Sequence, residues 1–229
     1  MIAQAVEIRD RTDASCVADN GFCPGWIVDH LDRYRQPLEE HVVLVLVSVS
    51  IGFAIASALA LVAHRRRWLV GPITNVTGIL YTIPSVAAFF LLLPLTGRGK
   101  DTAIIALVSY TLLILFRNMM DGLDSVPEEA RDAGRGMGLT GRQLLWRVEL
   151  PLALPAILAG LRVATTTTVG LTALVFFAGA GGLGEVINNQ LAFKSDVVMA
   201  GLLCVLLAAV LDGLILLTQR LLTPWTRVA

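Results

Sequence analysis

Five long apolar stretches, separated by short polar segments, divide the chain. Each is long enough, or nearly so, to cross the ~30 Å hydrocarbon core of a membrane as an α-helix. They cover approximately residues 42–63, 70–95, 102–116, 152–180 and 197–217. The second contains Pro84 and Pro94 and the fourth contains Pro155, which a spanning helix tolerates only where neighbouring groups satisfy the freed carbonyls. The pattern predicts an all-α integral membrane protein with about five transmembrane helices.

The composition agrees with a membrane protein. Of the 229 residues, 55% are hydrophobic and 16% are charged, whereas a soluble domain has about 25% charged residues. The formal net charge is zero, so it gives no reason to expect a nucleic-acid partner. This composition predicts that the protein is in contact with membrane lipid.

The basic residues are distributed unevenly between the polar segments. Those at 64–68, in the loop 118–151 and towards the C-terminus would all lie on one side of the membrane. The tail 1–41, on the other side, carries more acidic than basic residues. Because positive charge favours the cytoplasmic side, we expect the N-terminus outside and the C-terminus inside. The expected organisation is an extracytoplasmic tail (1–41), a transmembrane domain (42–223) with a cytoplasmic loop (118–151), and a cytoplasmic tail (224–229).

Two charged residues fall within the predicted spans. Arg162 lies in the fourth and Asp212 in the fifth, both in the half predicted to be cytoplasmic. Charged groups inside a membrane usually face a cavity or one another, so we expect these two to pair. The nearby threonines, Thr165 and Thr166 among them, either bond to carbonyls of their own helix or line a pathway.

The chain carries few signs of a catalytic or metal site. It lacks the GxxxxGK[ST], HExxH and GxSxG motifs, so no catalytic residue is predicted. Cys16 and Cys23 flank an Asn-Gly turn on the predicted outer side, where a disulfide can persist. They are either bridged or two free thiols in a mobile tail. Without nearby histidines they form a poor metal site, and no metal is expected.

The polar stretch DAGRGMGLTGRQLLWRVELP, residues 132–151, lies between the third and fourth predicted spans. Its pattern predicts two short amphipathic helices with a corner at Gly138. One apolar face is expected from Val126, Ala130, Ala133 and Met137, and a second from Leu144, Leu145 and Val148. Such an element buries one face, and its arginines suit an acidic or nucleotide-charged soluble neighbour.

This stretch resembles the cytoplasmic EAA loop of ABC-importer permeases. That loop has Glu-Ala-Ala, a Gly six residues after the Glu, an aliphatic residue ten after the Gly, and a closing Leu-Pro. Asp replaces the Glu here, and Gly replaces the second Ala, while the spacing is kept. The resemblance places the coupling loop at Asp132, Ala133, Gly134, Gly138, Leu139, Val148, Leu150 and Pro151.

The rest of the chain narrows the family. The stretches at 80–118, 148–170 and 177–187 resemble permease subunits of osmoprotectant importers, which carry glycine betaine, choline or carnitine. The likeness covers approximately residues 42–223. It is less specific for the substrate, because methionine-type and other amino-acid importers share the loop pattern and a similar glycine-rich stretch.

The resemblance implies a type I ABC importer architecture. Two permease subunits, copies of this chain or this chain and a paralogue, would form the pathway, and an extracytoplasmic binding protein would deliver substrate. A cytoplasmic ATPase dimer would hold ATP and Mg, so this chain would need no cofactor and have no catalytic site. The segment GAGGLG, with Gly179, Gly181, Gly182 and Gly184, is either a flexible turn or a place of close helix packing at a gate or dimer.

An ion-coupled secondary transporter is the alternative from another class. Such a protein should have inverted repeats with matching broken helices and carboxylates near the middle of the membrane. The prolines at 84 and 155 suggest matching breaks only faintly, and five spans do not divide into equal halves. Asp212 is the one candidate coupling carboxylate in the sequence.

Overall fold

The structure, a computed structural model, describes residues 15–227, which form helices and connecting turns without a β-strand. The elements in chain order are α2 (Pro24–Asp29), η1 (Leu31–Tyr34), α3 (Arg35–Arg65), η2 (Arg67–Leu69), α4 (Val70–Thr82), α5 (Ser85–Thr96), α6 (Lys100–Asp124), α7 (Glu128–Gly136), α8 (Gly141–Leu144), the π-helical turn η3 (Leu145–Glu149), α9 (Leu150–Thr172), η4 (Val175–Ala178), α10 (Leu183–Asn189), α11 (Lys194–Leu222) and η5 (Pro224–Arg227).

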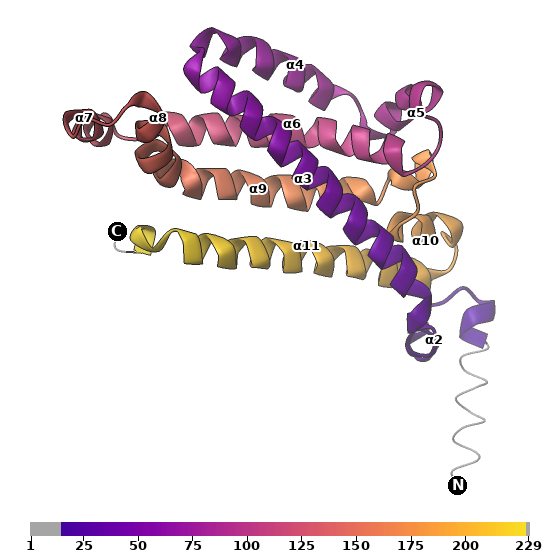
Figure 1. Ribbon diagram of the computed structural model, residues 1–229. Helices are drawn as coiled ribbons and strands as arrows, with labels where there is room; N and C mark the ends of the chain where they lie inside the picture. Colours follow the sequence, from indigo (N-terminus) through magenta and orange to yellow (C-terminus); the bar gives the residue numbers. More distant parts are fainter. Residues whose placement is uncertain (1–14, 228–229) are drawn as a thin grey trace.

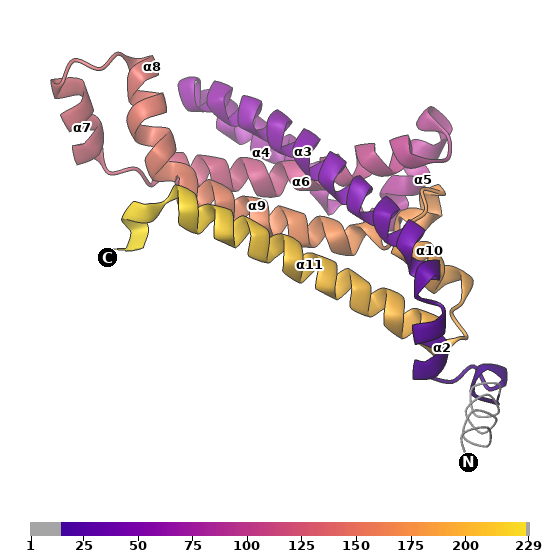
Figure 2. The ribbon, with the colours of Figure 1, turned by 60° about the horizontal axis from the view of Figure 1, so that its bottom comes forward.

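The helix α6 is the centre of the bundle. It packs against α3 and α9, and α11 packs along α9. Figure 1 shows α7, α8 and the C-terminus at one end of the bundle, and α2, α5 and α10 at the other. The described chain therefore begins and ends at opposite ends of the bundle, and the turned view in Figure 2 has the same arrangement. Which end faces the cytoplasm stays a prediction.

Four helices are long and apolar enough to cross a membrane, within Leu31–Arg65, Lys100–Asp124, Gly141–Thr172 and Lys194–Leu222. A fifth crossing exists only if the bent pair Arg67–Thr82 and Ser85–Thr96 is counted as one span. All-α architecture is thus confirmed for residues 15–227, and the predicted number of spans becomes four or five.

The predicted second span, 70–95, consists of two helices, α4 and α5, separated at Pro84. It bends by 97° between α4 and α5. Ile83 has an extended backbone, with ψ 127°, because the ring of the following Pro84 disfavours helical geometry at the residue before it. The carbonyl of Ile83 is freed by this break, and the hydroxyl of Tyr110 on α6 donates a hydrogen bond to it. A neighbouring helix therefore satisfies the group that the proline leaves unpaired.

Two predicted boundaries also need correction. The helix α3 begins at Arg35, before the apolar stretch that starts at 42, because the polar residues continue the helix and Arg35 pairs with Glu39 one turn later. The fourth stretch, predicted as 152–180, ends as a helix at Thr172. Beyond Thr172 the backbone bonds tighten to three-residue spacing, as from the Ala173 N–H to the Gly170 carbonyl. Gly179, with φ 73°, then ends the short turn η4.

Small residues allow α6 to lie close to its neighbours. A Cβ atom built on Gly52 of α3 would lie 2.0 Å from the hydroxyl oxygen of Thr111 on α6. One built on Gly160 of α9 would lie 2.3 Å from the Cβ atom of Asn118 on α6. Lipid tails give helices no hydrophobic reason to associate, so this close packing is a main source of their attraction.

We predict that Gly160→Ala destabilises the protein, because the Cβ atom of Asn118 cannot rotate away from the added methyl group. Overpacking of this kind costs about 1–3 kcal/mol. The matched control is Gly201→Ala on α11, where an added Cβ meets no atom within 4 Å. Thermal unfolding in detergent should show a lower midpoint for the first variant only, and equal midpoints would contradict the close approach of α6 and α9.

Candidate functional site

The loop between α6 and α9 begins with the short helix α7. Pro127 precedes the helix, and Glu128 and Glu129 lie in its first turn. Proline suits this position because it needs no hydrogen-bond acceptor there, and acidic side chains interact favourably with the positive end of the helix dipole. These three residues therefore fix where α7 begins.

The corner after α7 is a Schellman motif at Gly138. Its φ is 80°, a left-handed value that glycine adopts without steric cost. The Gly138 N–H donates to the Arg135 carbonyl at 2.9 Å, and the Leu139 N–H donates to the Gly134 carbonyl at 3.1 Å. These two bonds satisfy carbonyls at the end of the helix. The predicted corner at Gly138 is present, and Leu139 takes part in closing it.

The second helical segment begins with a capping box and leads through a π-helical turn into α9. The Thr140 side chain accepts from the Gln143 N–H, and the Gln143 side chain accepts from the Thr140 N–H. Pro151, at the start of α9, has no N–H to donate, and the turn η3 just before it is π-helical. Such turns are often found at functional sites, because they redirect one side chain of a helix.

The face of α7 that is buried differs from the predicted one. Val126, from the predicted face, is buried at 4% exposed, but Ala133 and Met137 are exposed, the latter at 73%, and Gly134 is buried instead. The reason is the close approach of Leu144, whose methyl carbon would lie 2.6 Å from a Cβ atom on Gly134. A side chain at 134 would force the Leu144 methyl group to shift, whereas glycine permits the contact as it stands. The helix α7 thus turns Gly134 inward and leaves Ala133 exposed.

The exposed side of α7 is available to another molecule. Ala133 and Met137 lie one turn apart on it, and Asp132 is also exposed. Val148 lies against Gly134 on the inner side, with Leu150 half-buried at the start of α9. The loop residues thus divide into an anchored inner side and a free outer side.

One buried carboxylate ties the loop to the helices. Glu149, at the end of η3, is 6% exposed. Its Oε1 accepts from the Arg131 guanidinium of α7 at 3.0 Å, and its Oε2 accepts from Nε2 of His64 on α3 at 2.9 Å. Arg131 also donates to the Leu123 carbonyl of α6 at 2.7 Å. This Glu149 hub therefore connects α7 to three long helices, α3, α6 and α9.

A second group of charges holds α7 from its exposed side. Arg135 lies 2.8 Å from Glu128 and 2.9 Å from Asp132. Hydrogen bonds from Arg131 first, and from Arg135 second, lower the pKa of the Glu128 carboxyl below its usual value. The carboxyl stays ionised at the helix start, where negative charge is favourable. Asp132 is thus engaged with Arg135 within the loop.

Arg162 and Asp212 join α9 to α11. Arg162 Nε lies 2.7 Å from Asp212 Oδ1 and its Nη2 lies 2.7 Å from Oδ2, a bidentate pair. The expected pairing is therefore present. The hydroxyl of Thr165 donates to the Leu161 carbonyl at 2.8 Å, and that of Thr166 donates to the Arg162 carbonyl at 3.0 Å. Both threonines bond within their own helix, the first of the two alternatives.

The glycine-rich segment lies at the opposite end of the bundle from α7 (Figure 1). Gly179, Gly181 and Gly182 have positive φ values of 73°, 83° and 84°, so they form a turn that other residues rarely adopt. Gly184 packs on α9, because a Cβ atom there would lie 1.8 Å from the Ala173 carbonyl oxygen. The Gly182 N–H donates to the Glu40 carboxylate at 3.2 Å. Both a turn and close packing occur here, and a role at a gate or dimer stays a prediction.

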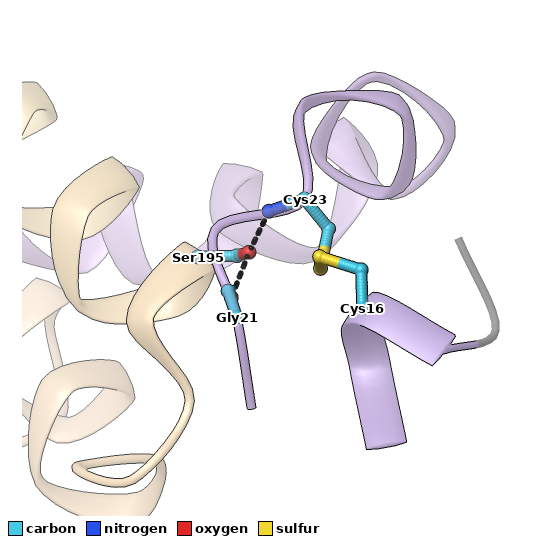
Figure 3. Close-up of a disulfide and its surroundings, with 4 residues drawn as sticks. All are labelled: Cys16, Gly21, Cys23 and Ser195. Atoms are coloured by element: carbon cyan, nitrogen blue, oxygen red, sulfur yellow. Dashed lines mark hydrogen bonds between the residues drawn. A yellow bond between two sulfur atoms is a disulfide. The ribbon is translucent and has the colours of Figure 1, made fainter. Parts of the chain in front are cut away.

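Residues 15–34 fold onto the start of α11. Of the two alternatives for Cys16 and Cys23, the structure has the disulfide (Figure 3). Ser195 accepts from the Cys23 N–H at 2.8 Å and donates to the Gly21 carbonyl at 3.0 Å. The next residue, Asp196, is buried and accepts from the Tyr34 hydroxyl at 2.6 Å. The part of the predicted tail that lies in residues 1–14 is outside the described range.

Two buried acids were not predicted from the sequence. Glu149 and Asp196 are fully or almost fully buried, yet each lies at the edge of an apolar stretch where an exposed acid is common. Both could have been suspected of burial because each acid comes directly before a predicted span and has no recognisable partner nearby in the sequence. Within residues 15–227 no group of three or more His, Cys, Asp or Glu side chains could hold a metal ion.

Comparison with known proteins identifies the family. The family model described as binding-protein-dependent transport system inner membrane component matches residues 49–228. The chain belongs to this family. It is accordingly a multi-pass protein of the inner, or plasma, membrane.

Curated relatives of this inner membrane component are transport permeases. The osmoprotectant import permease protein OsmW of Salmonella typhimurium is 40% identical over 207 residues, which is 87% of this chain and 96% of the relative. The choline transport system permease protein OpuBB of Bacillus subtilis is 36% identical, over 81% of this chain and 86% of the relative. The glycine betaine/carnitine/choline permease OpuCB of the same organism is 34% identical, with the same coverage of both chains.

Solved structures share the fold of this inner membrane component. A chain of the inward-facing MetNI methionine ABC transporter superimposes with a TM-score of 0.76 at 22% identity, over 83% of this chain and 96% of that one. A chain of an amino acid ABC transporter with histidines gives a TM-score of 0.70 at 16% identity, over 85% and 96%. At these identities the likeness establishes the fold alone.

We predict that Arg162→Ala and Asp212→Ala each lower the yield of folded protein strongly, because each leaves one charge unpaired within a span. The double substitution should recover part of that yield, since it removes both charges. Size-exclusion chromatography of a fluorescent fusion measures the monodisperse fraction. A double variant that behaves no better than either single variant would show that the two residues act independently.

Proposed function

We propose that this chain is the membrane-spanning permease subunit of an ATP-driven importer for quaternary-amine osmoprotectants such as glycine betaine, choline or carnitine. The observation that carries the substrate class is the 40% identity with an osmoprotectant import permease over 87% of this chain. The methionine transporter is similar at 22% identity only, so it supports the fold without favouring amino acids. Transport would proceed by alternating access of the pathway to the two sides of the membrane.

Coupling to a separate ATPase is proposed to occur at the outer side of α7. Ala133 and Met137 are exposed there, and the opposite side is held by Gly134 against Leu144. A cytoplasmic ATPase dimer would hold ATP and Mg, and this chain would contribute position alone. A helix anchored on one side and free on the other is suited to receive a partner and to pass its movement on.

The Glu149 hub is proposed as the connection between α7 and the spans. A displacement of α7 acts on Arg131, and Arg131 is bonded both to Glu149 and to the Leu123 carbonyl of α6. Glu149 leads directly into α9, and His64 connects it to α3. Closure of the ATPase would therefore reach α3 and α9 through Glu149, and α6 through Arg131.

A quaternary ammonium group is recognised by aromatic faces because it cannot donate a hydrogen bond. Among residues 15–227, the aromatic side chains predicted to lie along the pathway do not form a cage. Tyr81 and Tyr110 lie edge to face, with ring centroids 5.9 Å apart, and Phe89 is completely buried. Two rings in this arrangement do not enclose a cation. We propose that selection occurs mainly in an extracytoplasmic binding protein, and that a second permease subunit completes the pathway.

The ion-coupled alternative has less support. Its coupling carboxylate would have to be Asp212, whose two oxygens are both bonded to Arg162. A coupling carboxylate must bind and release an ion during transport. Asp212 could do so only by breaking its two bonds to Arg162, which would leave the arginine unpaired within a span. The family match points the same way.

We predict that Ala133→Arg abolishes retention of the ATPase while leaving the permease folded. The side chain is exposed in the isolated chain, where such changes alter stability by about 0.5 kcal/mol or less. In an interface, a large charged group in place of a methyl should lower ATPase retention by about tenfold or more. Affinity purification from native membranes with mass spectrometry measures this retention. Ala18→Arg, at the other end of the molecule, is the matched control.

An equal loss in both variants would indicate misfolding, and retention of an ATPase by both would exclude α7 as the docking element. If the parent protein, purified in mild detergent, carries no ATPase, an ion-coupled secondary transporter becomes the favoured function.

We predict that Glu149→Gln uncouples the permease from its ATPase. The amide keeps the size of the side chain but removes the charge that holds Arg131 and His64, so ATPase retention should persist while substrate uptake per ATP falls by about tenfold. Uptake and ATP hydrolysis by the reconstituted complex measure the ratio. A proportional fall of both rates would indicate a merely structural role for Glu149. Glu129→Gln, on the exposed first turn of α7, is the control.

A further inference from the structure

A groove lies where α3 ends and α8 begins, beside the Glu149 hub. Two adjoining cavities of about 430 and 420 Å³ make up this groove, and they share Arg65, Arg142 and Leu145 as lining residues. One cavity adds the apolar side chains of Leu61, Val62 and Trp146. The other adds His64, Gly141, Leu144 and Glu149. We refer to the whole as the Arg65–Arg142 groove.

The two arginines give the groove a positive charge that the described residues do not neutralise. Neither Arg65 nor Arg142 forms an ion pair or a side-chain hydrogen bond with any residue in the range 15–227. Glu149 is the one carboxylate in the lining, and it is already bonded to Arg131 and His64. The groove therefore offers two free guanidinium groups, which suit a phosphate because they present several donors in a fixed fork.

The groove lies at a membrane boundary. Arg65 is the last residue of the candidate span Leu31–Arg65, and Arg142 is near the start of the candidate span Gly141–Thr172. Trp146 is 57% exposed beside it, and Trp68, just past the end of α3, is 70% exposed. Exposed tryptophans are typical of the level of the lipid headgroups.

The polar and apolar halves of the groove fit different parts of one molecule. The half with Arg65 and Arg142 suits an anionic headgroup, and basic pockets between spans bind such headgroups. The half with Leu61, Val62 and Trp146 is apolar and suits an acyl chain. Leu61 and Val62 precede Arg65 within the candidate span, so they lie further from its end. A free phosphate would use only the first half, so the apolar lining favours a lipid.

We propose that the Arg65–Arg142 groove binds an anionic phospholipid, whose phosphate lies between the two guanidinium groups and whose acyl chain lies along Leu61, Val62 and Trp146. The proposal does not rest on the proposed transport function, because binding at this site needs no ATPase and no transported substrate. Its affinity should fall as salt is added, since charge attraction is screened.

The test uses the quenching of Trp146 by lipids that carry bromine on their acyl chains. The full chain is placed in nanodiscs of phosphatidylcholine with increasing brominated phosphatidylglycerol or, in parallel, brominated phosphatidylcholine. The difference between the parent and Trp146→Phe isolates the signal of Trp146. We expect quenching at a lower fraction of phosphatidylglycerol than of phosphatidylcholine, and loss of about fivefold in this preference for each arginine replaced in Arg65→Gln and Arg142→Gln.

The control is the double variant Arg66→Gln with Arg147→Gln, which removes the same charge from the same end without changing the groove lining. It should reduce the preference far less. The double variant Arg65→Lys with Arg142→Lys keeps the charge, so it should still prefer phosphatidylglycerol. Such a result would show that the loss in the glutamine variants does not come from misfolding.

Three results would overturn the proposal. Equal quenching by the two lipids, or an equal effect of the control variant, would leave no headgroup site in the groove. Abolition of the preference by dissolved inorganic phosphate at matched ionic strength would indicate a site for small anions. Loss of a co-purifying ATPase from the Arg65→Gln and Arg142→Gln variants, with lipid quenching unchanged, would assign the groove to that protein.

Discussion

Helices in a membrane cannot be held together by the hydrophobic effect, because lipid tails are as apolar as their side chains. The bundle must therefore depend on close packing and on a small number of polar links. Close packing is provided where glycines of α3 and α9 meet α6, as at Gly52 and Gly160. These contacts explain why α6 is central to the bundle.

The polar links occur at three levels of the bundle, and each joins elements that are far apart in the sequence. At one end, Ser195 and Asp196 hold residues 15–34 against α11. Between the ends, Arg162 and Asp212 join α9 and α11. At the other end, Glu149 joins α7 to α3 and α9. An isolated charge in such surroundings is costly, so each link restricts which arrangements of the helices are accessible.

The sequence predicted the local features and one long-range pair, Arg162 with Asp212, but missed the other long-range contacts. The helical class follows from the composition, and the corner follows from the preference of Gly138 for positive φ. The pairing of Arg162 with Asp212 follows from the cost of a charge within a span. The buried face of α7 was misjudged, because periodicity alone could not show that Leu144 approaches at residue 134. The partners of Glu149 lie 18 and 85 residues away, a separation over which no sequence pattern connects them. The bend at Pro84 was seen as a break, but its 97° angle depends on how α4 and α5 pack against α6.

The helix α7, proposed for coupling, and the proposed lipid groove share residues. Glu149 and His64 form the hub that holds α7, and both also line the polar half of the Arg65–Arg142 groove. A molecule that binds in the groove and a partner that binds α7 would therefore both change the surroundings of one carboxylate. Thermodynamic linkage makes such an effect reciprocal: if the lipid strengthens or weakens docking at α7, docking must change lipid affinity by the same factor. The sign of this coupling depends on how the bound phosphate moves the guanidinium groups of Arg65 and Arg142. If they move towards Glu149, their positive charge competes with Arg131 for that carboxylate, and if they move away, this competition is relieved.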